Sequence, residues 1–170
     1  MTATQPLREE HRELVPHIQA LREVADGVGV APADAVRRGV DQACEFLSHH
    51  LIPHAEAEER VLYPVVQRLL GAPRATATMS RDHVEIGRLV AELTAVRTEL
   101  GAGAIGEEPA RALRRLLYGL HALVSVHFAK EEEVYLPLLD AGLTPEAARE
   151  MFAEMERAAG EAKARQRAAA

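Results

Sequence analysis

Two short segments with the same pattern constrain the fold of this chain more than any other feature. Each has a histidine followed four residues later by a glutamate: His54 with Glu58, and His127 with Glu131. Both lie in strongly helix-forming surroundings, and four residues of an α-helix advance the direction by about 400°, so the two side chains point about 40° apart on one face. An imidazole nitrogen and a carboxylate one turn apart can bind the same metal ion. The pattern therefore predicts two helices that each present a His–Glu pair.

The surroundings of the two pairs also match, which indicates an internal repeat. Each motif glutamate is followed directly by a second glutamate and, six residues on, by Pro64 or Pro137. Upstream, the residues around His11 resemble those around His83. The interval from this histidine to the motif histidine is 43 residues in the first copy and 44 in the second. The chain thus contains two copies of one unit: a histidine, a long interval, His-x-x-x-Glu-Glu and an apolar segment with a proline.

The composition favours an all-α protein with one aliphatic core. Of the 170 residues, 48% are apolar but only 4% are aromatic, and the helix-forming residues Ala, Leu, Glu and Arg dominate over short β-branched runs. Glycine and proline punctuate the sequence where helices should begin and end. The helices are expected at about 5–27, 33–70, 76–101, 107–140 and 144–167. Pro53 lies inside the second of these, so we expect a bend close to the first motif.

Short connections between the first four helices predict an up-down-up-down four-helix bundle with an extra C-terminal helix. We expect the bundle to occupy residues 1–142, with half-repeats at about 7–70 and 76–140. Residues 143–170 would form the C-terminal helix and tail. When each half folds back on itself, His11 comes level with His54, and His83 comes level with His127, because the helical arms differ by only about 3–6 Å in length.

The sequence also excludes several classes of partner. The net charge is −6 and no basic stripe is present, so nucleic acid is not an expected ligand. No apolar run of 18 residues predicts a membrane span, and the first residues lack the pattern of a signal peptide. The lone Cys44 cannot form an intramolecular disulfide and fits a reducing cytoplasm, where we expect the protein. The sequence identifies no protein partner.

The repeat and the bundle together place six candidate ligands on four helices. These metal ligands are His11, His54, Glu58, His83, His127 and Glu131. One tetrahedral zinc needs only four ligands, so six in two matching halves predict two metal ions, each with two imidazoles, and two carboxylates free to bridge. Imidazole and carboxylate without thiolate suit iron, and manganese or zinc accept the same donors. Taken singly, each histidine is more often half-exposed, and His-x-x-x-Glu is also a common surface pair.

Other residues near the motifs are less informative. His50 lies four residues before His54 and on its expected face, as an extra ligand or a neighbour of one. Tyr135 lies four residues after Glu131 and can approach the site, although packing is its ordinary role. The acidic neighbours of the candidate ligands are expected to be solvated. They are Glu10, Glu59, Glu132 and Glu133.

The arrangement of His, His-x-x-x-Glu, His and His-x-x-x-Glu resembles the hemerythrin-like HHE cation-binding family. The resemblance covers roughly residues 7–140. It implies a four-helix bundle made of two helical hairpins around a non-haem di-iron centre, with the six residues named above as iron ligands. It also implies a protein that binds or senses oxygen, nitric oxide or peroxide. Alternatives are a di-iron enzyme that decomposes peroxide, an iron-handling protein, or a helical interaction module.

One position departs from the pattern of the oxygen-carrying members of that family. They have a second histidine four residues after the third-helix histidine, where this chain has Gly87. Glycine offers no side chain to a metal. We therefore expect an open position on one of the two ions, close to Gly87.

Overall fold

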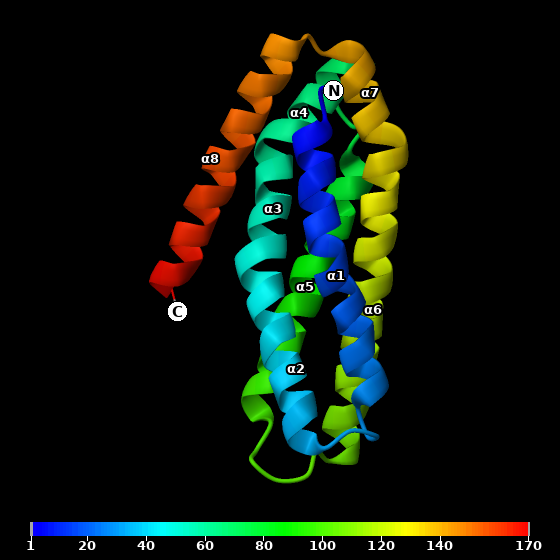
Figure 1. Cartoon of the computed structure of the whole chain (residues 1–170), viewed down its shortest axis with the longest axis vertical. Helices are drawn as coiled ribbons and strands as arrows, with labels where there is room; N and C mark the ends of the chain where they lie inside the picture. The colour runs from blue at the N-terminus through cyan, green and yellow to red at the C-terminus, as the bar shows by residue number, and fades with distance from the viewer. Residues whose placement is uncertain (1, 170) are drawn as a thin grey trace.

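The bundle consists of four long helical segments, called rods here, at residues 5–27, 33–70, 77–99 and 107–142. The first and third rods are single uninterrupted α-helices that run side by side with the longer second and fourth (Figure 1). The computed structural model describes residues 2–169. In it α1 spans Gln5–Gly27 and α5 spans Ala77–Glu99. The apolar spacing predicted both helices, and α1 has the bounds that the sequence indicated.

The other two rods consist of α-helical pieces joined by π-helical turns. Residues 33–70 form α2 (Ala33–Phe46), η1 (Leu47–Leu51), α3 (Ile52–Ala57), η2 (Glu58–Leu62) and α4 (Tyr63–Leu70). Residues 107–142 form α6 (Glu107–Lys130), η3 (Glu131–Tyr135) and α7 (Leu136–Gly142). Gly71, with φ of 61°, ends the first of these rods in the left-handed conformation that glycine adopts without strain.

Each π-helical turn ends just before a proline, and the proline explains it. Proline has no N–H to continue the i→i−4 ladder, and its ring crowds the preceding turn. The residue before it donates instead to a carbonyl five residues back: Tyr63 N–H to Glu58 O in η2, and Leu136 N–H to Glu131 O in η3. The disturbance expected at the prolines therefore takes the form of widened turns, and two of these begin at the motif glutamates.

The apolar core is divided into two clusters at different levels along the bundle. The larger cluster includes Leu14, Leu51 and Val124, and the smaller includes Leu7, Leu62 and Leu139. In sequence, His11, His54, His83 and Glu131 each fall between members of one cluster and members of the other. The polar centre consequently lies at mid-bundle with an apolar layer on either side of it.

The last helix, α8 (Pro145–Ala169), packs obliquely on the outside of α3 (Figure 1). Thr144 caps it, with the Ala147 N–H donating to Thr144 Oγ1 at 3.2 Å. Met151 and Met155 are buried in the smaller apolar cluster. The predicted all-α fold class, including the extra C-terminal helix, is confirmed. None of the helices between residues 2 and 169 has the length and hydrophobicity needed to cross a membrane.

Candidate metal centre

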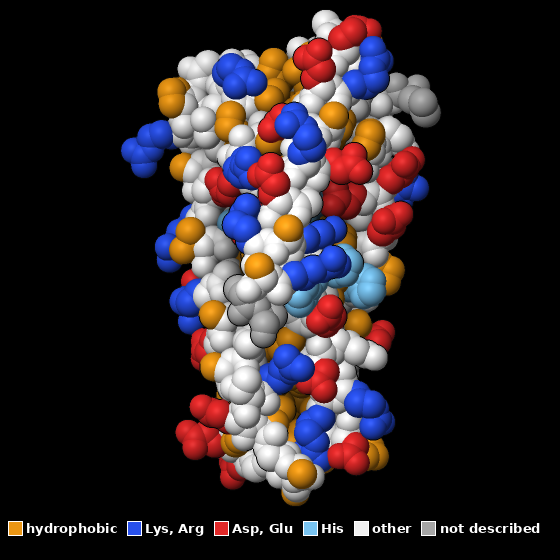
Figure 2. Space-filling view, turned by 90° about the vertical axis from the view of Figure 1, so that its left-hand side faces the viewer, with side chains coloured by type: hydrophobic (Ala, Val, Ile, Leu, Met, Phe, Trp, Pro, Cys, Tyr) orange, Lys and Arg blue, Asp and Glu red, His pale blue; other side chains and the backbone are white. Residues whose placement is uncertain are grey.

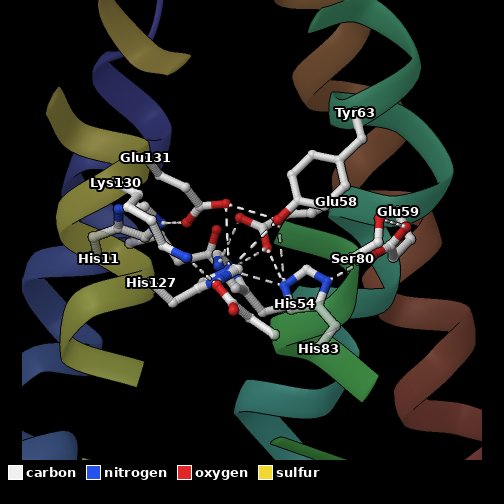
Figure 3. Close-up of polar contacts among 12 residues, drawn as sticks. His11, His54, Glu58, Glu59, Tyr63, Ser80, His83, His127, Lys130 and Glu131 are labelled. Atoms are coloured by element: carbon white, nitrogen blue, oxygen red, sulfur yellow. Dashed lines mark hydrogen bonds and ion pairs between the residues drawn. The ribbon is translucent and has the colours of Figure 1, made fainter. Parts of the chain in front are cut away.

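The six candidate ligands converge from all four rods at the middle of the bundle (Figure 3). Five of these side chains are exposed by 3% or less, and His83 by 9%. The structure brings together every residue that the sequence proposed: His11 from α1, His54 from α3, Glu58 from η2, His83 from α5, His127 from α6 and Glu131 from η3.

The one-turn spacing places the members of each motif against one another. His54 Nε2 lies 3.1 Å from Glu58 Oε1, and His127 Nε2 lies 3.5 Å from Glu131 Oε1. Both glutamates are the first residues of π-helical turns. Each helix therefore offers an imidazole nitrogen and a carboxylate oxygen to the same point in space.

The donor atoms form two groups in which all atoms lie within 4.8 Å of one another. The four-donor group contains His11, His54, Glu58 and Glu131, and the three-donor group contains Glu58, His83 and His127. Glu58 belongs to both, because its Oε1 faces His54 while its Oε2 lies 3.3 Å from His83 Nε2. One carboxylate thus spans two positions, each with two imidazoles.

A carboxylate holds the outer nitrogen of every one of these imidazoles. The Nδ1 contacts are His11 to Glu132 at 2.9 Å, His54 to Glu10 at 3.1 Å, His83 to Glu59 at 2.8 Å and His127 to Asp82 at 3.1 Å. A carboxylate only accepts hydrogen bonds, so each Nδ1 carries a proton and each Nε2 faces the centre, where its lone pair would serve a bound metal. Metal-binding histidines are commonly oriented by such carboxylates.

The acidic neighbours have this role although the sequence pattern predicted only that they would be solvated. Glu10, Glu59 and Glu132 are partly exposed, as expected, but each also orients a candidate ligand. Asp82 was not singled out at all. Their positions in the repeat could have indicated this role. An acidic residue directly precedes both His11 and His83, and another directly follows each motif glutamate.

Several polar atoms in the centre are buried without a hydrogen bond to any described residue. They are His11 Nε2, His54 Nε2, both oxygens of Glu58 and Glu131 Oε2. Leaving a buried polar atom unpaired costs on the order of 1–3 kcal/mol each. Because imidazole nitrogens and carboxylate oxygens that converge in this way are metal ligands, metal cations are the group that this donor set fits.

The charges in the metal-free cluster are strongly coupled. Burial acts to lower the pKa of His54, but the Glu58 carboxylate outweighs it and raises that pKa well above its usual value. In the same way, burial opposes the ionisation of Glu58, yet the positive charge of His54 and the close imidazoles of His127 and His83 hold its pKa well below its usual range. Burial and the charge of Glu58 raise the pKa of Glu131. The cluster therefore favours a cation beside Glu58.

Tyr63, which the sequence did not indicate as a site residue, also reaches the centre. The Tyr63 hydroxyl donates to Glu131 Oε1 at 3.1 Å and lies 3.4 Å from His83 Nε2 (Figure 3). Burial, followed by the charge of Glu58, raises its pKa, so it remains a hydrogen-bond donor at neutral pH. The tyrosine singled out from the sequence, Tyr135, instead donates to the Ala75 carbonyl at 3.1 Å.

His50 does not join the centre. Its ring is exposed and lies parallel to Phe46 at a centroid distance of 6.3 Å, and Phe46 stacks on His17 at 4.9 Å. Figure 2 shows exposed histidines on the face of the molecule that carries α8. The expectation of a shared face with His54 assumed regular α-helical periodicity, whereas His50 lies within the π-helical turn η1.

The fold and the centre define a class of protein: an all-α bundle with a buried histidine–carboxylate cluster suited to cations. Residues 2–139 match the hemerythrin HHE cation binding domain family. The chain belongs to this family, and the predicted resemblance is confirmed. Comparisons with curated proteins and with solved structures gave no significant match. The helix α8 lies beyond the matched residues.

Proposed function

We propose that this chain is a non-haem di-iron protein that binds or senses a small ligand: oxygen, nitric oxide or peroxide. The four-donor group would hold one metal ion and the three-donor group the other, with Glu58 between them. Membership of a cation-binding family supports the metal, and the donor types support iron, while manganese and zinc accept the same ligands.

The observation that carries this proposal is the set of buried donor atoms without hydrogen-bond partners. Nothing about packing four helices requires carboxylates and imidazoles at the centre, and burying them unpaired opposes folding. Two cations would satisfy these atoms and offset the charge of the glutamates. This cost argues against a purely structural helical module with incidental histidines.

The surrounding residues suit the binding of a small ligand. Bound iron would supply a coordination position that an exogenous molecule can occupy. The carboxylates beyond the histidines fix the imidazoles, and the two apolar clusters exclude bulk water from above and below. The Tyr63 hydroxyl lies where it can donate a hydrogen bond to a molecule held beside His83.

A peroxide-decomposing enzyme is the second candidate, and Tyr63 is the observation that favours it. The Tyr63 hydroxyl, 3.4 Å from His83 Nε2, can donate a hydrogen bond that stabilises the negative charge developing on a leaving oxygen. If peroxide is consumed with turnover, replacing Tyr63 with Phe should lower kcat while the iron content stays unchanged. A ligand-binding protein would show binding without turnover.

The proposal is tested by elemental analysis of protein expressed in iron-replete medium. We expect about two metal ions per chain, mostly iron, and an optical spectrum that changes when nitric oxide or peroxide is added. Peroxide consumption measured on the same sample separates the two candidates. Purified protein that contains no metal and takes up none from ferrous iron under anaerobic conditions would refute the proposal.

A further inference from the structure

The internal repeat creates two related grooves on opposite flanks of the centre. Residues of α1 correspond to residues of α5 at an offset of 72, and residues of the second rod correspond to those of the fourth at an offset of 73. One groove lies between α1 and α6 and touches His11. The other lies between α3 and α5 and touches His83. Both therefore lead towards candidate ligands, but different side chains line them.

A phenylalanine separates the α1/α6 groove from the centre. This groove is the larger, with a volume of about 590 Å³, and Phe128 and Val15 line it. The Phe128 ring stacks on His11 with centroids 4.2 Å apart and lies 5.7 Å from the His54 ring. Phe128 is only 5% exposed. Its ring thus fills the space between this groove and the imidazoles.

In the α3/α5 groove the corresponding side chains are absent or small. Ala55 takes the position of Phe128, and Gly87 takes the position of Val15. A Cβ atom added at Gly87 would meet no atom within 4 Å. The groove has a volume of about 310 Å³, several times the roughly 30 Å³ that a water molecule occupies in the liquid. Space for a small molecule therefore exists beside His83.

The open groove is on the same side as the donor group with fewer protein ligands. His83 belongs to the three-donor group, and it is the most exposed of the six candidate ligands at 9%. A metal with three protein donors retains positions for exogenous molecules. The groove and the more open metal position thus lie on one flank of the bundle.

Charged residues at the rim of this groove are paired with the extra helix. Arg60 Nη1 lies 2.7 Å from a Glu161 oxygen, and Glu56 lies 2.5 Å from Arg165 Nη2. Glu59 also lines the groove and is held by His83 and Ser80. The rim therefore carries acidic side chains and an arginine whose charge is already paired. It attracts anions only weakly, and it does not oppose the entry of an uncharged molecule.

We propose that small uncharged ligands reach the metal centre through the α3/α5 groove, between Ala55 and Gly87, and that Phe128 closes the pseudo-equivalent route. This inference rests on the proposed metal-binding function. It assigns a role in ligand access to two small residues on α3 and α5.

The test measures nitric oxide binding to the iron-loaded protein by stopped-flow absorbance. Gly87→Leu should lower the association and dissociation rate constants together by at least tenfold, leaving Kd and iron content nearly unchanged. The matched control is Val15→Leu, which places the same side chain at the corresponding position of the closed groove and should leave both rates unaltered. Association rates for Gly87→Leu equal to those of the unmodified protein would refute the access route.

A second variant tests the closed route and guards against a simple folding defect. Phe128→Ala, added to Gly87→Leu, should restore rapid binding by opening the other groove. If the double variant misfolds, as judged by circular dichroism, Gly87→Cys provides the same test. Methyl methanethiosulfonate should slow nitric oxide binding to that variant, and a reductant should reverse the effect, whereas the native Cys44 is buried. Unchanged rates after complete modification would overturn the proposal.

The two proposals fail in different ways. If the unmodified protein takes up no metal, the proposed function is wrong and the access route has no meaning. If it takes up iron and binds nitric oxide, but Gly87→Leu and modified Gly87→Cys bind as fast as the unmodified protein, only the access route is wrong.

Discussion

Removing the metal should lower the melting temperature by roughly 10–20 °C. Five buried donor atoms of the centre make no hydrogen bond, and each costs at least about 1 kcal/mol when left unpaired. Metal binding should therefore contribute about 5 kcal/mol of stability even at the lower figure. For a chain of 170 residues, each kcal/mol corresponds to roughly 2–4 °C. Circular dichroism at a helical wavelength, on chelator-treated protein and on protein reloaded with ferrous iron, measures the difference.

Glu58 provides the decisive variant because it belongs to both donor groups. Glu58→Gln keeps the shape of the side chain but removes its charge, so iron uptake should fall and the melting temperatures with and without iron should converge. Glu85→Gln is the matched control, since Glu85 pairs with Arg88 on the surface away from the centre. If the unmodified protein binds two irons yet melts within about 2 °C of its metal-free form, the unpaired donors are not what the metal satisfies.

Three further predictions concern the residues around the centre. Glu59→Ala or Glu132→Ala should weaken iron binding by about 10–100-fold in metal titrations, because each removes the carboxylate that orients a histidine. Although burial opposes it, hydrogen bonds that the imidazole donates to Glu131 and Glu58 raise the pKa of His127 to about 10 in the metal-free protein. The resulting stabilisation should be complete below about pH 6.5 and lost as the pH rises through 10, which melting curves against His127→Gln will show. Met151→Ala should reduce the stability by about 2–5 kcal/mol in urea unfolding, since this α8 side chain is 6% exposed.

The helices were predictable because their signals are local. Apolar spacing, together with glycine and proline at the junctions, predicted α1 and the interruption between the second and third rods. The bundle followed from short connections, and the convergence of the candidate ligands followed from the repeat. His11 and His83 needed that repeat, because neither carries a motif of its own. Their role as ligands stays a prediction that metal analysis must test.

The further side chains that contact the candidate ligands could not be predicted from a helical wheel. Tyr63 lies five residues after Glu58, a spacing that ordinary α-helical geometry turns away from the motif face. The π-helical turn η2 rotates less per residue than an α-helix, so five residues bring Tyr63 back towards the face of Glu58, and its hydroxyl points into the centre. The same irregularity removed His50 from the face of His54. A proline predicts that the helix is disturbed, but the direction in which the following side chains turn depends on tertiary packing.

The two halves of the repeat differ at a few corresponding positions, and these differences make the centre asymmetric. Where the copies agree, as in the motif pairs and the acids beside them, the side chains build two similar sets of donors. Where they disagree, the centre becomes asymmetric: Phe128 stands opposite Ala55, and Tyr63 corresponds to Leu136. The phenylalanine stacks on a histidine of the four-donor group, while the tyrosine hydroxyl and the open groove lie beside His83 of the three-donor group. If each donor group holds one ion as proposed, these two departures would enclose one metal position and leave the other accessible, so an exogenous ligand would meet a single ion with a hydrogen-bond donor next to it.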